Sequence, residues 1–152
     1  MTCVCGAGAG PLGECADYYH AILSEEQRDP GMWSWHAPVV CAYLLQHPAD
    51  GHPRFLDTQY RWLQLLLDQG IDALVKVAAY QKARNRHGSR QGYDMAPFEK
   101  YDPLPADFPT RFRESFSGLP VADGSFVFDG HEAYGRRIGI LAEATVEAFR
   151  SS

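Results

Sequence analysis

The stretch of residues 35–48 constrains the fold most, because it has the pattern of one short helix with a histidine at each end. Pro38 suits a first helical turn, where a missing N–H costs nothing. His47 precedes a proline, and the residue before proline is pushed out of the α region. We therefore predict a helix over about 37–46. At about 1.5 Å per residue, His36 and His47 are roughly 16 Å apart, so they cannot bind the same metal ion.

The remaining apolar pattern predicts four more helices, each with hydrophobic residues at intervals of three and four. They cover residues 14–27, residues 54–69, residues 71 to about 86, and a last segment ending near residue 149. Asp129 and Glu132 fit a capping box at the start of the last helix. Five helices with short connections imply an all-α fold, a compact bundle.

Length and composition suit one helical domain over residues 1–152. Hydrophobic residues make up 45% and charged residues 22%, which excludes wholesale disorder. The net charge of -5 argues against a nucleic-acid partner, which needs a basic face. No run approaches the roughly 20 apolar residues that span a bilayer, and the first residues do not resemble a signal peptide. We therefore expect no membrane partner and a cytoplasmic location.

Two segments lack a regular period. Residues 1–13 contain two cysteines, four glycines and one proline, and such a segment orders only if something ties it down. Residues 88–128 are rich in proline and aromatic side chains and are too apolar for a linker. We expect them to form a long ordered wrap over the bundle before the last helix, with one short helix near residues 110–117.

The four cysteines suggest a metal site, redox thiols or buried apolar side chains, because disulfides are uncommon in the cytoplasm. Zinc prefers four cysteine and histidine ligands in a tetrahedron. If the first two helices pair antiparallel, Cys15 at the start of one meets His47 at the end of the other. The preferred ligand set is therefore Cys3, Cys5, Cys15 and His47, around a zinc ion.

Several alternatives remain open at this point. His20, one turn after Cys15, is the first substitute ligand. Cys41 is the second, but it lies about 9 Å along the helix axis from His47 and fits better as a small buried hydrophobe. A histidine before a helix-ending proline also serves as a hydrogen-bonded cap. The spacing Cys-x-Cys is tighter than the usual Cys-x-x-Cys, which leaves the role of Cys3 open.

The chain resembles a family of small bacterial proteins of unknown function over about residues 3–70 and 120–150. The shared positions are Cys5-Gly6-Ala7, Cys15, Tyr19, Leu23, Glu26, Asp29-Pro30, His36, Tyr43, Gln46-His47-Pro48 and a closing helix at 141–149. The chain departs from that pattern in its Cys-x-Cys pair, in Cys41 where aspartate is usual, and in residues 80–118. The resemblance implies a helical fold with a clustered Cys/His motif, and it implies no activity.

The favoured functional hypothesis is a metal-stabilised helical domain that binds a small molecule or a protein partner. His36, Tyr43 and Gln46 would line its pocket, with Trp33 and Trp35 nearby, since pockets combine apolar walls with a few placed polar groups.

Two other functions compete with it. In a metal-dependent enzyme acting on a small metabolite, His36 or His47 would be a base or a ligand and Tyr43 a proton donor. In a thiol redox sensor, the three N-terminal cysteines would react. No P-loop, HExxH or Ser-His-Asp motif supports an NTPase, a metalloprotease or a serine hydrolase.

Overall fold

A computed structural model describes residues 3–86 and 92–152, and within them the fold is all-α. The helices are α1 (Cys15–Arg28), α2 (His36–Gln46), α3 (Pro53–Gln69), α4 (Ile71–Arg84) and α5 (His131–Ser151). The predicted set of five helices is confirmed. The described ranges contain no β-strand, and two isolated bridges are their only β-type pairings.

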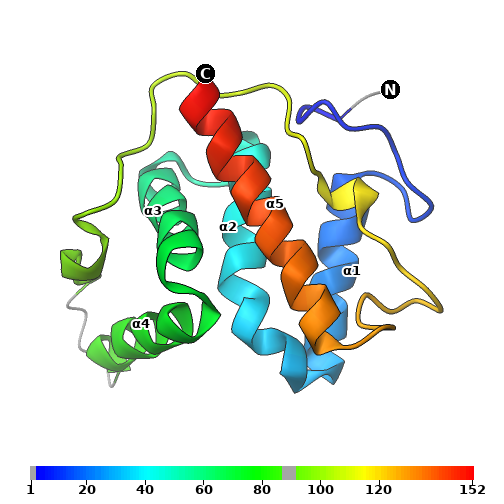
Figure 1. The fold of residues 1–152 in the computed structure, drawn as a ribbon, viewed down its shortest axis with the longest axis horizontal. Helices are drawn as coiled ribbons and strands as arrows, with labels where there is room; N and C mark the ends of the chain where they lie inside the picture. The colour runs from blue at the N-terminus through cyan, green and yellow to red at the C-terminus, as the bar shows by residue number, and fades with distance from the viewer. Residues whose placement is uncertain (1–2, 87–91) are drawn as a thin grey trace.

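Helix α2 lies at the centre of the bundle. It packs against α1, α3 and α5, and Figure 1 shows α5 crossing in front of it with α1 and α3 on either side. Seven of its eleven residues are buried. A helix that is apolar around most of its circumference is stable only when neighbours cover it on several sides. The apolar sequence of α2 therefore determines its central place.

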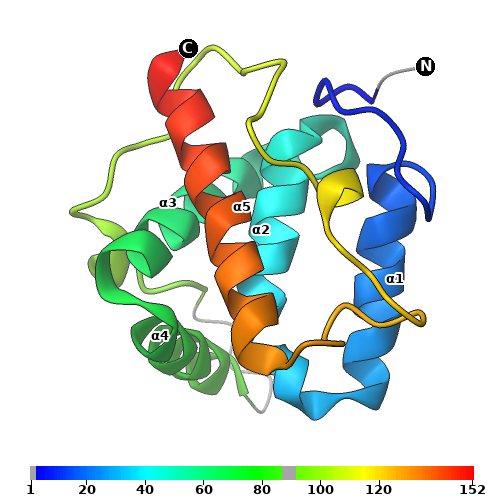
Figure 2. The same ribbon diagram turned by 45° about the vertical axis from the view of Figure 1, so that its right-hand side comes forward.

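A sharp reversal joins α1 to α2. The connection is a 3-10 helix, η1 (Pro30–Trp35), whose proline cannot continue α1. The Asp29 carboxylate accepts a hydrogen bond of 3.0 Å from the Gly31 N–H and fixes the turn. As a result α1 and α2 run antiparallel, as Figure 2 shows, and the start of α1 lies beside the end of α2.

The last helix begins differently from the expectation. Gly130, with a φ of 102°, precedes the first helical residue, and no side chain caps the helix. The predicted capping box of Asp129 and Glu132 is therefore wrong. The Asp129 carboxylate instead pairs with the guanidinium of Arg137. A charged partner two turns into the helix competes successfully with the free backbone N–H groups for this carboxylate.

The segment before α5 is an ordered wrap, as predicted, although residues 87–91 lie outside the described residues. It contains two short 3-10 turns, η4 (Ala96–Phe98) and η5 (Phe116–Gly118), so the helix expected near residues 110–117 is reduced to the second of these. Three phenylalanines of the wrap are buried in the core: Phe98, Phe116 and Phe126. In Figure 1 the chain passes over the end of the bundle where the C-terminus lies and returns to α1.

Polar side chains of the helices hold the wrap in place. The buried Glu25 carboxylate accepts hydrogen bonds from the Ser125 hydroxyl at 2.6 Å and from the Phe126 N–H at 2.8 Å. Gln64 of α3 exchanges two hydrogen bonds with the backbone of Asp102, at 2.8 and 2.9 Å. Buried polar groups are tolerated when they are paired in this way.

In the described parts of the chain, none of the helices has the length and apolar character that crossing a membrane requires.

Two glycines of α5 give a matched test of the packing. A Cβ added at Gly135 would lie 2.6 Å from ring atoms of Trp35, whereas one added at Gly139 meets nothing within 4 Å. We expect Gly135→Ala to lower the free energy of unfolding by about 1–3 kcal/mol through overpacking. Gly139→Ala should raise it by about 0.5–1 kcal/mol, because alanine favours the helix. Chemical denaturation measures both, and equal effects would contradict the close packing of α5 on η1.

Candidate metal centre

The four predicted ligands lie together at one end of the α1–α2 pair. Cys3 and Cys5 come from the N-terminal loop, Cys15 is the first residue of α1, and His47 directly follows α2. Their ligand atoms all lie within 4.8 Å of one another. Cys15 is 0% exposed and His47 3%. The four residues could therefore hold one metal ion.

The distances between ligand atoms are close to those of a tetrahedral zinc site. The Cys3 Sγ lies 3.1 Å from the His47 Nε2, and the Cys5 Sγ lies 3.6 Å from the Cys15 Sγ. Zinc bond lengths of about 2.3 Å to sulfur and about 2.0 Å to nitrogen put tetrahedral ligand atoms roughly 3.5–3.8 Å apart. All four cysteines of the chain are free thiols. The arrangement thus needs only small adjustments to accept an ion.

The imidazole of His47 is oriented for ligation. Its Nδ1 lies 2.9 Å from the Tyr43 carbonyl oxygen, so this nitrogen carries the proton and donates it. The lone pair of Nε2 is then left to face the sulfur atoms. A hydrogen bond from the second ring nitrogen to a backbone carbonyl is the usual outer support of a metal-bound histidine. The helix-capping alternative for His47 is compatible with this, because each ring nitrogen has a separate partner.

Aromatic rings fix the His47 imidazole in place. It stacks on Tyr43 at 4.3 Å between centroids, and Tyr43 stacks on Tyr19 of α1 at 3.9 Å. Phe116 of η5 packs edge-on against both tyrosines. The Tyr43 hydroxyl donates a 2.9 Å hydrogen bond to Asp50, and burial raises the pKa of Tyr43. Tyr43 therefore supports the site and holds its proton.

The thiols of Cys5 and Cys15 share a proton unequally. Hydrogen bonding from Cys5, followed by that from His47 and Ser117, lowers the pKa of Cys15. The same contact with Cys15, together with burial, raises the pKa of Cys5. The thiolate thus forms at the N-terminus of α1, where the helix dipole favours negative charge. A bound cation would stabilise this charge and displace the remaining proton.

The tight Cys-x-Cys spacing is accommodated by a turn at Gly6. Its N–H donates a 2.8 Å hydrogen bond to the Cys3 carbonyl, and its φ is 89°, which favours glycine. A Cβ here would lie 3.0 Å from the Thr110 carbonyl oxygen. This turn places the Cys3 sulfur beside His47, so the short spacing does not remove Cys3 from the cluster.

The two substitute ligands lie elsewhere. His20 is exposed and lines a separate pocket with Tyr19 and Asp50. Cys41 is buried within α2, where burial raises the pKa of its thiol to about 12. Neither belongs to the group of four, and Cys41 is the small buried hydrophobe that its sequence context favours.

The residues expected to line one pocket do not lie together. Gln46 is buried, and its amide donates to the Glu114 carbonyl and the Thr145 hydroxyl, each at 3.0 Å. Tyr43 belongs to the aromatic stack beside His47. His36 lies at the opposite end of α2. Helical spacing predicted that these side chains share one face of α2. Along the length of the helix, however, different neighbouring segments cover that face.

Sequence reasoning missed Ser117, which joins the cluster from the wrap. Its hydroxyl donates a 2.7 Å hydrogen bond to the Gly8 carbonyl and lies 3.7 Å from the Cys15 Sγ. More than 100 residues separate it from both partners, and no local signal marks it. Sequence reasoning also missed the partner of Glu26, whose Oε2 lies 2.6 Å from the His36 Nδ1.

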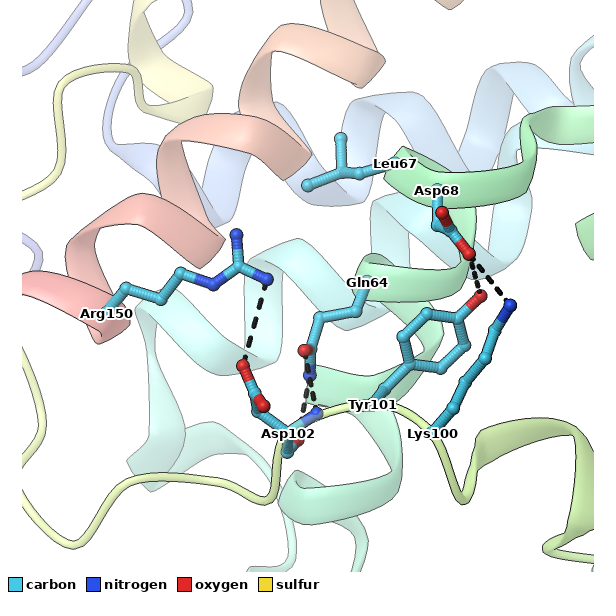
Figure 3. A pocket seen from close by; sticks show the side chains of 7 residues that line it. All are labelled: Gln64, Leu67, Asp68, Lys100, Tyr101, Asp102 and Arg150. Carbon is cyan, nitrogen blue, oxygen red and sulfur yellow. Dashed lines mark hydrogen bonds and ion pairs between the residues drawn. The ribbon is translucent and has the colours of Figure 1, made fainter.

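A polar cavity beside α3 and α5 offers a weaker candidate. Figure 3 shows it between α3, the end of α5 and residues 100–102, with a volume of about 520 Å³. Asp68 pairs with Lys100 at 3.1 Å, and Asp102 lies 4.0 Å from Arg150. These exposed charges neutralise one another, so the cavity presents no excess charge to a ligand.

The glycines of the N-terminal loop allow a matched test of how it packs. A Cβ at Gly10 would lie 2.4 Å from the Ser117 carbonyl oxygen and from the Tyr18 hydroxyl, whereas one at Gly8 meets nothing within 4 Å. Gly10→Ala should lower the free energy of unfolding by about 1–3 kcal/mol, and Gly8→Ala should change it little. Thermal and chemical unfolding measure the difference. A Gly10→Ala protein as stable as the wild type would show that the loop does not pack on η5.

Glycine spacing in the same loop could suggest a different site. Residues 8–13 match the spacing G-x-G-x-x-G of dinucleotide-binding loops. That motif requires a preceding strand of a parallel sheet. Here Gly10 and Gly13 bond to each other through their backbones at 2.8 and 3.0 Å, and no strand occurs within the described ranges. The loop therefore lacks the setting of a dinucleotide site.

Comparison with known proteins identifies one family that matches the chain. No curated protein and no solved structure matches the chain. A family model described as "Family of unknown function (DUF5946)" matches residues 1–150, nearly the whole chain. The protein therefore belongs to the DUF5946 family.

Proposed function

We propose that the protein is a helical domain whose N-terminal loop is held by one structural zinc ion, and that the domain binds a small molecule or a protein partner. One observation carries the metal assignment. Three cysteine sulfurs and the Nε2 of His47 converge within 4.8 Å, while the Nδ1 of His47 is bonded to a carbonyl. Zinc fits this donor set best, because soft thiolates with one imidazole select it over the oxygen-seeking cations.

A structural role fits the number and burial of the donors. Four protein ligands complete a tetrahedron and leave no position for water or substrate. The loop that carries two of them has little apolar surface of its own, so an ion supplies the energy that orders it. The thiols would remain reduced in a compartment such as the cytoplasm, which is the location we propose.

A metal-dependent enzyme is the second candidate, and one observation favours it. Cys3 is half-buried, whereas the other three ligands are buried. If Cys3 gave way to water, the ion would gain the open position that metal-activated hydrolysis requires. The redox-sensor hypothesis is weaker, because sensor thiols are accessible and the close pair of Cys5 and Cys15 is buried.

The metal content of the purified protein tests the proposal. We expect about one zinc per chain that resists dialysis, measured by elemental analysis. Cys15→Ser should lose the zinc and lower the thermal midpoint, because metal-binding energy is folding energy. Cys41→Ala is the matched control: it removes a cysteine outside the cluster and should keep the zinc. A wild-type protein without metal, or a Cys15→Ser protein that retains it, would refute the structural zinc.

Alkylation of the native protein separates the zinc site from a thiol sensor. With zinc bound, iodoacetamide should modify none of the cysteines, because three are ligands and Cys41 is buried. After chelation by EDTA, we expect up to three adducts by mass spectrometry, with Cys41 still protected. Rapid modification of Cys5 or Cys15 before chelation would favour the sensor hypothesis over the zinc site.

A further inference from the structure

A hydrogen bond between a buried carboxylate and an imidazole lies at the end of α2 opposite the cysteine cluster. Glu26 of α1 is only 1% exposed, and its Oε2 lies 2.6 Å from the Nδ1 of His36. A buried carboxylate is retained only when a partner offsets its desolvation, so this contact fixes the orientation of the imidazole. The other carboxylate oxygen, Oε1, has no hydrogen-bond partner among the described residues.

Among the described residues, the second ring nitrogen of His36 has no hydrogen-bond partner. The Nδ1 is engaged with Glu26, yet the side chain is 38% exposed and borders a cavity of about 370 Å³ between α2, α3 and α4. Nε2 is therefore the nitrogen available to a ligand. In the neutral imidazole whose Nδ1–H donates to the carboxylate, Nε2 is a hydrogen-bond acceptor.

The cavity has aromatic and apolar walls and a second free acceptor. Trp62 and Tyr93 line it together with Val40 and Ala78. The Oε1 of Gln59, another lining residue, is buried without a partner among the described residues. An unpaired buried acceptor costs free energy unless a ligand or water satisfies it. The cavity therefore combines flat apolar surface with two acceptors, and Gln81, Lys82 and Asn85 line the rest of it. Its two acceptors suit a flat molecule that carries a donor.

The size of the cavity also suits a small ligand. Its volume of about 370 Å³ falls within the range of about 300–1,000 Å³ that small-molecule sites occupy. A neighbouring pocket shares Gln59, Trp62 and Tyr93 with it and extends the same surface past Phe55. A bicyclic ring fits the cavity beside His36, and the neighbouring pocket leaves room for a substituent on that ring.

We infer that this cavity binds a planar aromatic small molecule through an N–H or O–H donor shared with His36 Nε2 and Gln59 Oε1. The ring packs against Trp62 and Tyr93. The inference rests on the proposed ligand-binding function and names the class of ligand, but it is independent of zinc. The cysteine cluster lies roughly 16 Å away, along the length of α2.

A pair of nearly isosteric probes tests the inference on the as-purified protein. Indole carries one N–H donor, and benzofuran has the same shape with an oxygen in its place. In an NMR titration we expect indole to shift the Trp62 indole N–H signal with a dissociation constant of about millimolar, as suits a fragment of this size. Benzofuran should bind about five- to tenfold more weakly, which is the loss of one hydrogen bond.

Variants identify the acceptors. His36→Phe and Gln59→Leu keep the side-chain volume roughly constant, and each should weaken indole binding about fivefold or more while leaving benzofuran binding unchanged. His20→Phe is the matched control, since His20 is exposed beside a different pocket, and it should bind both probes like the wild type. Circular dichroism checks that each variant is folded.

Three outcomes would overturn the inference: no shift of the Trp62 signal, equal binding of indole and benzofuran, or an equal loss in His20→Phe. Zinc content is measured on the same samples. Bound zinc with no indole binding refutes this ligand site and leaves the metal centre standing. Indole binding without zinc refutes the metal centre and supports the ligand site.

Discussion

Helix α2 is covered by α1, α3 and α5, and this burial determines where both candidate sites lie. The antiparallel partner α1 fixes the two ends of α2 at once. At one end the first residue of α1, Cys15, meets His47, and at the other Glu26 meets His36. The α1–α2 pair thus positions both the cluster of three cysteines with His47 and the contact between the Glu26 carboxylate and the His36 imidazole. Any change in the η1 reversal would displace both, because the register between α1 and α2 depends on it.

Much of this arrangement could be predicted from the sequence. The apolar periods predicted the five helices nearly to the residue, and the short connection between the first two permitted them to pair antiparallel. That pairing placed Cys15 beside His47, and the length of the second helix excluded His36 from the same ion. The prediction succeeded because each step depended on local signals and on one short connection.

The failures arose where contacts between distant segments decide the outcome. Asp129 does not cap the last helix, because its carboxylate pairs with Arg137. Helical propensity does not reveal this contact. The pocket of His36, Tyr43 and Gln46 assumed that one helix face meets one environment, whereas Thr145, the aromatic stack and Glu26 cover successive parts of it. Ser117 could not be found at all, because nothing in the wrap marks which of its residues returns to α1.

The contact between Ser117 and the N-terminal loop has a consequence for synthesis in the cell. The hydroxyl of Ser117 holds the Gly8 carbonyl, and the backbone of η5 closes against Gly10. During translation the first residues leave the ribosome long before residue 117 exists, since domains are made from the N-terminus onwards. The N-terminal loop that carries Cys3 and Cys5 therefore cannot dock until most of the chain has emerged. Nascent chains would carry the thiols of Cys3 and Cys5 uncovered over that interval.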